Sequence, residues 1–231
     1  MRPFYASNGS VELLKWIGLV LMTGDHINKY LFNATLPALF EFGRLCLPIF
    51  VFVLAYNLAR PGAIAGKVYQ RTMLRLGVFG LLACLPFMYL GGLYQGWWPL
   101  NVLFTLLVIT ATVYLVERGG VHRWAAALVF LAGGAMVEYW WPAVAFGVCC
   151  WWYFKNPSPL ALLGALLSCS LLAVVNGNHW ALAALPLIGL ITHLSIPIPR
   201  IRWLFYCYYP AHLVAIALVR IPMSRAGYLF F

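Results

Sequence analysis

Two residues with acid–base chemistry stand side by side near the end of the first apolar stretch, "GLVLMTGDHINKYLF" (18–32), where Asp25 directly precedes His26. A neutral imidazole accepts a proton from an amine or hydroxyl, and a carboxylate can fix which ring nitrogen carries the hydrogen. Neighbouring helical residues point about 100° apart, so both face one pocket only where the helix ends. We expect either a general base with an orienting acid, or an interfacial Asp25–Lys29 pair beside a solvated His26.

A second charge, Arg44, lies inside the next apolar run, 36–59. A charge within a membrane segment normally faces a partner or a water-filled cavity. Glu41 lies one turn earlier and can pair with Arg44. The alternatives are therefore a structural Glu41–Arg44 pair and an anion anchor, in which the guanidinium fork binds a phosphate or carboxylate.

Further polar residues interrupt the later apolar runs. His212 lies in "YCYYPAHLVAIAL", one turn after Tyr208 on the same helical face. A histidine within a membrane segment is either a functional group or a core residue bonded to a neighbouring helix. Asn101 opens another run, where it either caps a helix or bonds a ligand. The loop "VVNGNHW" adds Asn176 and His179 as candidate binding residues, with a surface position as the alternative for His179.

The elements that must position these residues are membrane helices. The chain is 64% hydrophobic and 9% charged, whereas soluble domains are about half apolar and about a quarter charged. We predict an all-α, polytopic transmembrane bundle of about nine spans (eight to ten), forming a single domain over 1–231. The range reflects two neighbouring runs that are either a re-entrant pair or one broken helix, 122–140 and 141–154. The other predicted spans are 11–31, 36–59, 69–90, 99–116, 158–175, 180–196 and 203–222.

The net charge of +10 is spread over short loops between the apolar runs. That placement is typical of membrane orientation, and no cluster is long enough to follow a phosphate backbone, so we expect no nucleic-acid binding. The strongly basic loops fall on one side, which the positive-inside rule makes cytoplasmic, together with the amino terminus. Their residues are Arg60, Lys67, Arg71, Arg75, Arg118, Arg123, Lys155, Arg200 and Arg202.

Several kinds of site have no support in the sequence. The six cysteines show no C-x-x-C or zinc spacing and are expected to be small hydrophobic fillers. Five acidic residues in total do not favour a multi-carboxylate metal site, and we expect no metal. The H-E-x-x-H, G-x-S-x-G, Walker and dinucleotide-binding motifs are missing.

Five patches occur in a recognisable order: "LLKWIGLVLMTGDHIN", "FGRLCLPIFVFVLAYNLAR", "NVLF", "NGNH" and "FYCYYPAHL". This set resembles the TraX family, plasmid-encoded integral-membrane acyltransferases that acetylate the amino terminus of F-type conjugative pilin. The resemblance implies an enzyme of the bacterial inner membrane, with acetyl-CoA as donor and the α-amine of processed pilin as acceptor. It also implies that the active-site positions are Asp25, His26, Arg44, Asn101 and His212.

Taken together, residues and resemblance predict that His26, oriented by Asp25, deprotonates the pilin amine, which attacks the acetyl thioester. Arg44 or Asn101 would stabilise the oxyanion, or Arg44 would hold a coenzyme phosphate; His212 is a second candidate base. Additional expected binding residues are Tyr208, Asn176 and His179. The alternatives are a small-molecule or ion transporter and a non-catalytic pilin assembly factor.

The predicted topology raises a difficulty, because coenzyme A is cytoplasmic whereas most of the polar residues fall on the outer side. Three solutions stay open. The donor's pantetheine arm threads inward from the basic loop 60–75, the orientation is inverted, or an acetyl-histidine intermediate carries the group across.

Overall fold

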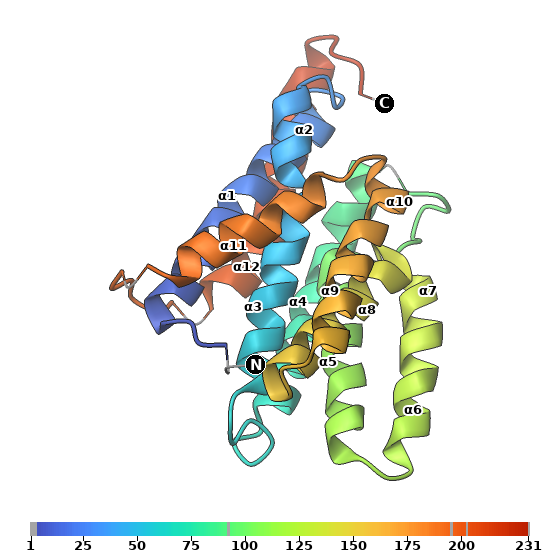
Figure 1. The fold of residues 1–231 in the computed structure, drawn as a ribbon. Coiled ribbons are helices and arrows are strands. Elements are labelled where there is room, and N and C mark those ends of the chain that lie inside the picture. The colour runs from blue at the N-terminus through green and yellow to red at the C-terminus, as the bar shows by residue number, and fades with distance from the viewer. Residues whose placement is uncertain (1–3, 92, 195, 202, 231) are drawn as a thin grey trace.

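Every regular element in the described part of the chain is a helix (Figure 1). The computed structural model describes residues 4–91, 93–194, 196–201 and 203–230, and within them the predicted all-α fold is confirmed. Apart from the helices, Leu100 and Val137 form an isolated parallel bridge. The helices are α1 (Asn8–Leu31), α2 (Pro37–Gly43), α3 (Cys46–Ala59), α4 (Val68–Leu90), α5 (Val102–Arg118), α6 (His122–Leu128), the π-helical η1 (Val129–Gly133), α7 (Gly134–Met136), α8 (Trp140–Lys155), α9 (Pro159–Leu171), α10 (Ala173–Asn176), the 3-10 helix η2 (Trp180–Ala183), α11 (Ala184–Thr192) and α12 (Leu204–Arg225).

The chain is a membrane protein, as its composition predicts. Among the described residues, four stretches are long and apolar enough to cross a membrane: Pro37–Ala59, Val68–Leu90, Pro159–Asn176 and Leu204–Arg225. The other predicted spans also coincide with helices, which are shorter or, in the case of α1, more polar. The two runs of uncertain relationship are separate helices: α6 to α7 ascend beside α5, and α8 then descends (Figure 1).

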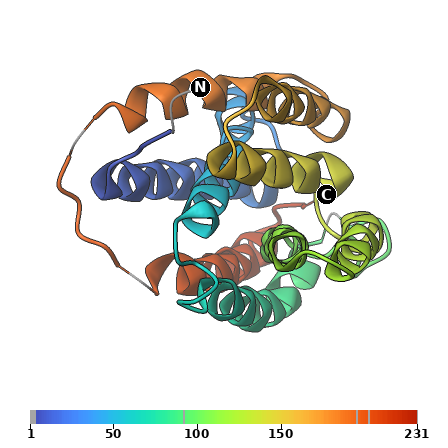
Figure 2. The ribbon, with the colours of Figure 1, turned by 60° about the horizontal axis from the view of Figure 1, so that its bottom comes forward.

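Helix α3 packs between α1 and α8, and α8 in turn packs on α9. On the other side of the bundle α4 packs against both α5 and α12, so helices distant in sequence lie side by side (Figure 2). Small residues allow close approach between these helices. A Cβ on Gly147 of α8 would lie 2.6 Å from Ile109 Cγ2 of α5, so only glycine permits this contact.

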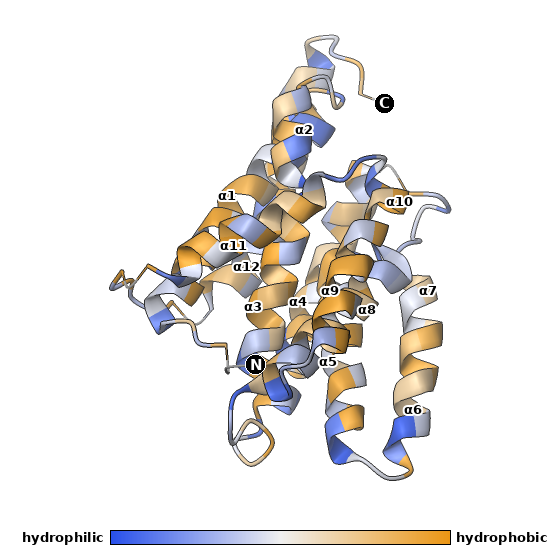
Figure 3. Cartoon of the chain, viewed as in Figure 1, coloured by the Kyte–Doolittle hydropathy of each residue, from blue (hydrophilic) through white to orange (hydrophobic). Residues whose placement is uncertain are grey.

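The two ends of the bundle differ in charge. The amino terminus and the loops that follow α3, α5 and α8 lie at one end, whereas the carboxyl terminus and α2 lie at the other (Figure 1). We call the first of these the basic end, because its loops and flanking helix ends carry Arg60, Lys67, Arg118, Arg123 and Lys155. Hydrophilic residues mark both ends, and the helices between them are mainly apolar (Figure 3). That the basic end faces the cytoplasm stays a prediction.

Candidate active site

The predicted span 36–59 is kinked where Arg44 lies. Helix α2 ends at Gly43 and α3 begins at Cys46, with a turn between them. Pro48 accounts for the break, because its ring clashes with the carbonyl of Arg44 and it offers that carbonyl no N–H. Two bonds that span three residues replace the four-residue helical bonds here: Arg44 N donates to the Glu41 carbonyl and Leu45 N to the Phe42 carbonyl, both at 3.1 Å. The kink leaves the Arg44 side chain beside α1.

Asp25 and Arg44 form a buried ion pair between α1 and this kink. Arg44 Nη2 donates to Asp25 Oδ1, and the two side chains are 12% and 13% exposed, Arg44 first. For each residue one predicted alternative was an ion pair within its own helix, with Lys29 for Asp25 and Glu41 for Arg44. The structure instead joins the two charges across helices, since Lys29 is exposed while Asp25 and Arg44 face the interior, where a charge needs a partner.

The Arg44 guanidinium is engaged by the protein on every nitrogen. Besides Asp25, Nε donates to the Phe40 carbonyl at 3.1 Å and Nη1 donates to Asn176 Oδ1 at 3.3 Å. The guanidinium also lies 4.4 Å from the centre of the Phe40 ring. Asn176, a predicted binding residue, therefore accepts a hydrogen bond from Arg44 and helps to hold its guanidinium in place.

Gly43 brings α2 close enough for this pairing. A Cβ at Gly43 would lie 2.5 Å from the Asp25 Cβ, a distance that side chains do not adopt. The glycine that precedes the arginine in the motif "GRLCLP" thus has a packing role. It allows the kink to sit directly on α1, which places the carboxylate within reach of the guanidinium.

His26 and His212 meet between α1 and α12. The Nδ1 atom of His26 lies 2.6 Å from Nε2 of His212, and the two ring planes are 4° apart. We expected Asp25 to orient His26; the structure gives that position to His212. The reason is helical geometry: adjacent residues of α1 diverge by about 100°, so Asp25 turns to Arg44 while His26 turns to α12.

The hydrogen bonds define the tautomers of the neutral pair. His212 Nδ1 lies 3.0 Å from the Tyr208 carbonyl, which only accepts, so Nδ1 carries the hydrogen. His212 Nε2 is then an acceptor, and His26 Nδ1 donates to it. The lone pair of His26 is consequently on Nε2, which makes no hydrogen bond within the described residues. An unprotonated, unpartnered imidazole nitrogen is the arrangement that a general base requires.

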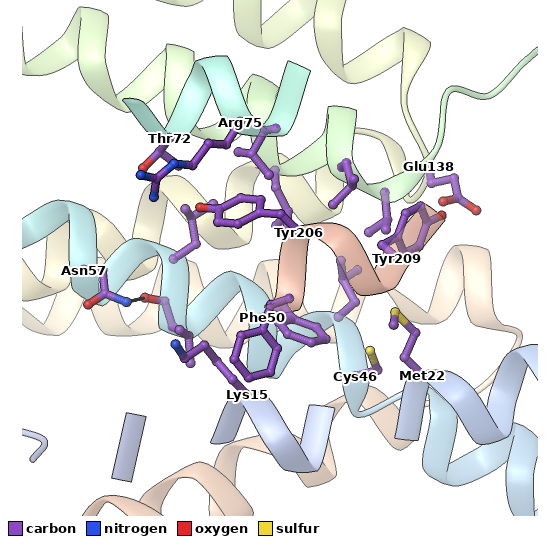
Figure 4. A pocket seen from close by; sticks show the side chains of 18 of the residues that line it. Lys15, Met22, Cys46, Phe50, Asn57, Thr72, Arg75, Glu138, Tyr206 and Tyr209 are labelled. Carbon is purple, nitrogen blue, oxygen red and sulfur yellow. Dashed lines mark hydrogen bonds between the residues drawn. The ribbon is translucent and has the colours of Figure 1, made fainter. Parts of the chain in front are cut away.

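A cavity of about 430 Å³ lies among α1, α3, α4, α5 and α12, and both Asp25 and His26 line it. Its wall is apolar along its middle, where Phe50, Leu54 and Leu106 lie. At one end it is lined by polar and basic groups, among them Lys15, Asn57, Arg71, Arg75 and Arg200. Figure 4 shows Lys15, Asn57 and Arg75 at this end, well separated from Glu138 and Tyr209 at the other.

Glu138 lines the cavity and was not among the predicted site residues. It lies in the turn between α7 and α8, outside the helical spans, and its backbone N–H donates to the Leu100 carbonyl at 2.9 Å. Tyr139 and Trp140, which follow it, have left-handed φ values of 63° and 48°. Such strain in non-glycine residues persists only where the surroundings impose it, and it is found at functional sites.

Removal from water raises the pKa of Glu138 to about 7, although Lys29 and the Val102 N–H favour its charged form. A clue to this residue was available: it is a carboxylate beside an apolar run with no basic residue within a helical turn.

The remaining predicted site residues lie beside the cavity or apart from it. Asn101 is fully buried as the N-cap of α5, accepting from Leu103 N, and its amide donates to the Gly80 carbonyl at 3.0 Å. Tyr208 stacks on His212 with ring centres 5.1 Å apart, and its hydroxyl lies 2.8 Å from Thr23 Oγ1. His179 is exposed at the start of η2. Asp25, Arg44, Asn176, His26 and His212 thus come together, and His179 does not join them.

Comparison with known proteins supplies independent information. A family model described as TraX protein matches residues 10–220. The chain is 32% identical over 126 residues to Protein TraX of Escherichia coli, a stretch that covers 54% of this chain and 48% of that protein. The chain therefore spans about half the length of the curated relative that it matches. No solved structure matches it.

Proposed function

The chain belongs to the TraX family, and from this premise we propose that it is a membrane-embedded N-acetyltransferase. Its donor is acetyl-CoA and its acceptor is the N-terminal amine of conjugative pilin, in the inner membrane of a plasmid-bearing bacterium. One observation carries the proposal: a single cavity connects a basic mouth with an imidazole whose free nitrogen is unprotonated.

The basic mouth supports a phosphorylated donor. Arg71, Arg75 and Arg200 line the cavity together at this end, and guanidinium groups bind phosphates in a fork. Arg200 is 67% exposed and so is available to a ligand from solvent. The coenzyme's nucleotide and phosphates would bind at this mouth, with the pantetheine arm lying along the apolar middle.

The cavity also addresses the difficulty of a cytoplasmic donor. Lys15 and His26 both lie on α1, eleven residues apart. At 1.5 Å per residue they are separated by roughly 16 Å along the helix axis, a distance that a long, thin thioester arm can bridge. With the basic end in the cytoplasm, as the positive-inside rule predicts, the thioester reaches His26 from that side without an acetyl-histidine carrier.

The reaction itself centres on His26. Its Nε2 takes a proton from the acceptor amine as the amine nitrogen forms a bond to the thioester carbonyl carbon. The carbon–sulfur bond then breaks, and the imidazolium returns the proton to the coenzyme thiolate. His212 accepts the hydrogen bond from His26 Nδ1 throughout, which holds the ring and stabilises its charged form. In this proposal His212 is a positioning residue.

Three other predicted residues take supporting roles. The guanidinium of Arg44 is occupied by Asp25, so the pair positions α1 and does not hold a coenzyme phosphate. Asn101 fixes the start of α5 through its cap. Tyr208 contributes the carbonyl that sets the His212 tautomer.

The deciding experiment uses purified full-length protein, isotope-labelled acetyl-CoA and mature pilin, with the label located by mass spectrometry. We expect one acetyl group on the pilin α-amine, and at least about a hundredfold slower labelling when His26→Ala protein is used. Absence of transfer by folded wild-type protein would overturn the proposal. Uptake of a solute into liposomes without any acylated product would instead identify a transporter, and pilin binding alone would identify an assembly factor.

A further inference from the structure

The cavity ends in two polar groups that the described residues satisfy only in part. The first is Glu138: among the described residues its carboxyl has no basic partner within 4.0 Å, and the Val102 N–H is the donor that favours its charged form. Glu41 also lacks an ion pair within the described part of the chain, but it lies on α2 and does not line the cavity. A carboxylate in an apolar membrane protein is costly unless a cation or several donors satisfy it. Its position on the cavity wall leaves room for a cationic ligand to do so.

The second group is the hydroxyl of Tyr209. Tyr209 is only 2% exposed and lines the same cavity, yet its hydroxyl has no hydrogen-bond partner among the described residues. Figure 4 shows this hydroxyl directed towards the Glu138 carboxyl. Its ring also packs against the two imidazoles, with ring centres 6.2 Å from His26 and 5.5 Å from His212. An unsatisfied buried hydroxyl beside the reactive histidine indicates that a ligand completes its bonding.

These groups match one kind of ligand. The Glu138 carboxylate, the Tyr209 oxygen and His26 Nε2 are three hydrogen-bond acceptors at one end of the cavity. A primary ammonium group has three N–H donors and one positive charge. A hydroxyl or a neutral amide has fewer donors and would leave the carboxylate uncompensated.

We propose that Glu138 and Tyr209 form the subsite that binds the acceptor as a primary ammonium ion, beside His26. The inference rests on the proposed function and names the part of the cavity that selects the acceptor. The subsite favours a free primary amine, and an acceptor that begins with proline, a secondary amine with one donor fewer, binds less well.

The subsite also accounts for both protons that an ammonium must lose. The bound ammonium first gives one proton to the Glu138 carboxylate and becomes a neutral amine. Its nitrogen then bonds to the thioester carbon while the second proton passes to His26 Nε2. The carbon–sulfur bond breaks, the coenzyme thiolate takes the proton from His26, and Glu138 releases its own proton to water. Ammonium and thioester thus yield amide, thiol and one free proton.

The test measures binding, so that it does not depend on turnover. The probes are a dye-labelled peptide of the first ten residues of mature pilin and its des-amino counterpart, which lacks only the terminal amine. Wild-type protein should bind the free-amine peptide at least about tenfold more tightly than the des-amino peptide. Glu138→Gln should abolish that preference, and Tyr209→Phe should reduce it. The matched control is Glu41→Gln, which removes a half-buried carboxylate from α2. This variant should keep the preference for the free-amine peptide.

The outcomes are distinct. Retention of the full preference by Glu138→Gln, with Kd values like those of wild type, overturns the inference. If Glu138→Gln does not fold, Glu138→Asp, which keeps the charge, should keep a preference that is weaker than wild type. Loss of the preference in Glu41→Gln as well would also count against the subsite. If wild-type protein transfers no acetyl group yet prefers the free amine through Glu138, the proposed function fails and the ammonium subsite stands.

Discussion

His26 and His212 are 186 residues apart in the chain, and the hydrogen bond between them joins α1 to α12 with 2.6 Å between the two nitrogens. Through this contact the Tyr208 carbonyl determines which nitrogen of His26 is free, although Tyr208 and His26 do not bond directly. The relationship distinguishes the two histidines, since only His26 has a nitrogen free to act on a substrate.

The first prediction concerns His26 itself. His26→Ala should lower kcat by about 10²–10⁴ fold, because proton transfer by a placed base contributes a factor of that size. The KM for acetyl-CoA should stay near its wild-type value, since the basic mouth lies at the other end of the cavity. Steady-state kinetics with pilin peptide would check both quantities. A normal kcat would remove His26 from the mechanism.

The second prediction separates the role of His212 from that of His26. His212→Gln keeps an acceptor for the His26 Nδ1–H, whereas His212→Leu removes it. We expect kcat to fall at least about tenfold more in the leucine variant, with a changed pH–rate profile, because its His26 ring is free to adopt the other tautomer. Equal losses in the two variants, with unaltered pH profiles, would mean that His212 only fills space.

The third prediction tests the Asp25–Arg44 pair. Asp25→Asn leaves the guanidinium as a buried charge without its counter-ion and should lower the free energy of unfolding by about 3–5 kcal/mol. The double variant Asp25→Asn/Arg44→Gln removes both charges and should recover part of that loss. Chemical unfolding of the wild type, the two single variants Asp25→Asn and Arg44→Gln, and the double variant in detergent gives the interaction energy from a double-mutant cycle. Additive losses would show that the two charges do not stabilise one another.

The fourth prediction concerns the approach of α2 to α1. Gly43→Ala places a methyl group 2.5 Å from the Asp25 Cβ, so the helices must separate and the ion pair must lengthen. We expect a loss of about 1–3 kcal/mol in stability, together with reduced activity. Gly77→Ala is the matched control, because a Cβ there meets no described atom within 4 Å. A melting temperature lowered equally by both substitutions would refute the packing argument.

The fifth prediction is a pH dependence of acceptor binding. Burial raises the pKa of Glu138 to about 7, so the carboxyl is neutral below that pH and charged above it. Lys29 and Arg44 favour the charged form, while Asp25 opposes it; Tyr139 and Tyr209 also line this end of the cavity. An ammonium binds the charged form, so the acceptor KM should fall as pH rises through about 7.

Above the α-amine pKa of about 7.7–8.0 the acceptor itself loses its charge, and KM should rise again. Measuring KM for the peptide between pH 5.5 and about 9 would reveal this minimum. In Glu138→Gln the fall on the acidic side should disappear, while the rise on the alkaline side should persist. A wild-type KM that does not change across pH 7 would argue against an ionised Glu138 in the complex.

The amino-acid sequence was sufficient for the fold class and for most helix positions. Composition excludes a soluble core, and each apolar run of suitable length becomes a helix because backbone groups in lipid must be satisfied within the segment. The kink at Arg44 follows from Pro48, and the cap of α5 follows from Asn101. Such features depend on residues close together in the chain, so local chemistry determines them.

The partners within the candidate site could not be obtained in the same way. Sequence spacing offered Lys29 as one possible partner for Asp25, Glu41 as one for Arg44 and Asp25 as one for His26. In the structure Asp25 and Arg44 pair with each other, and His26 bonds His212. Glu138 was not predicted as a site residue, because it lies in a loop between two apolar runs. The bridge between Leu100 and Val137 and the turn at Tyr139 place it on the cavity wall. A buried charge or imidazole pairs with a polar group that the packed helices bring close to it. Which group that is depends on how the helices cross, and the spacing of residues along one helix does not predict the crossing.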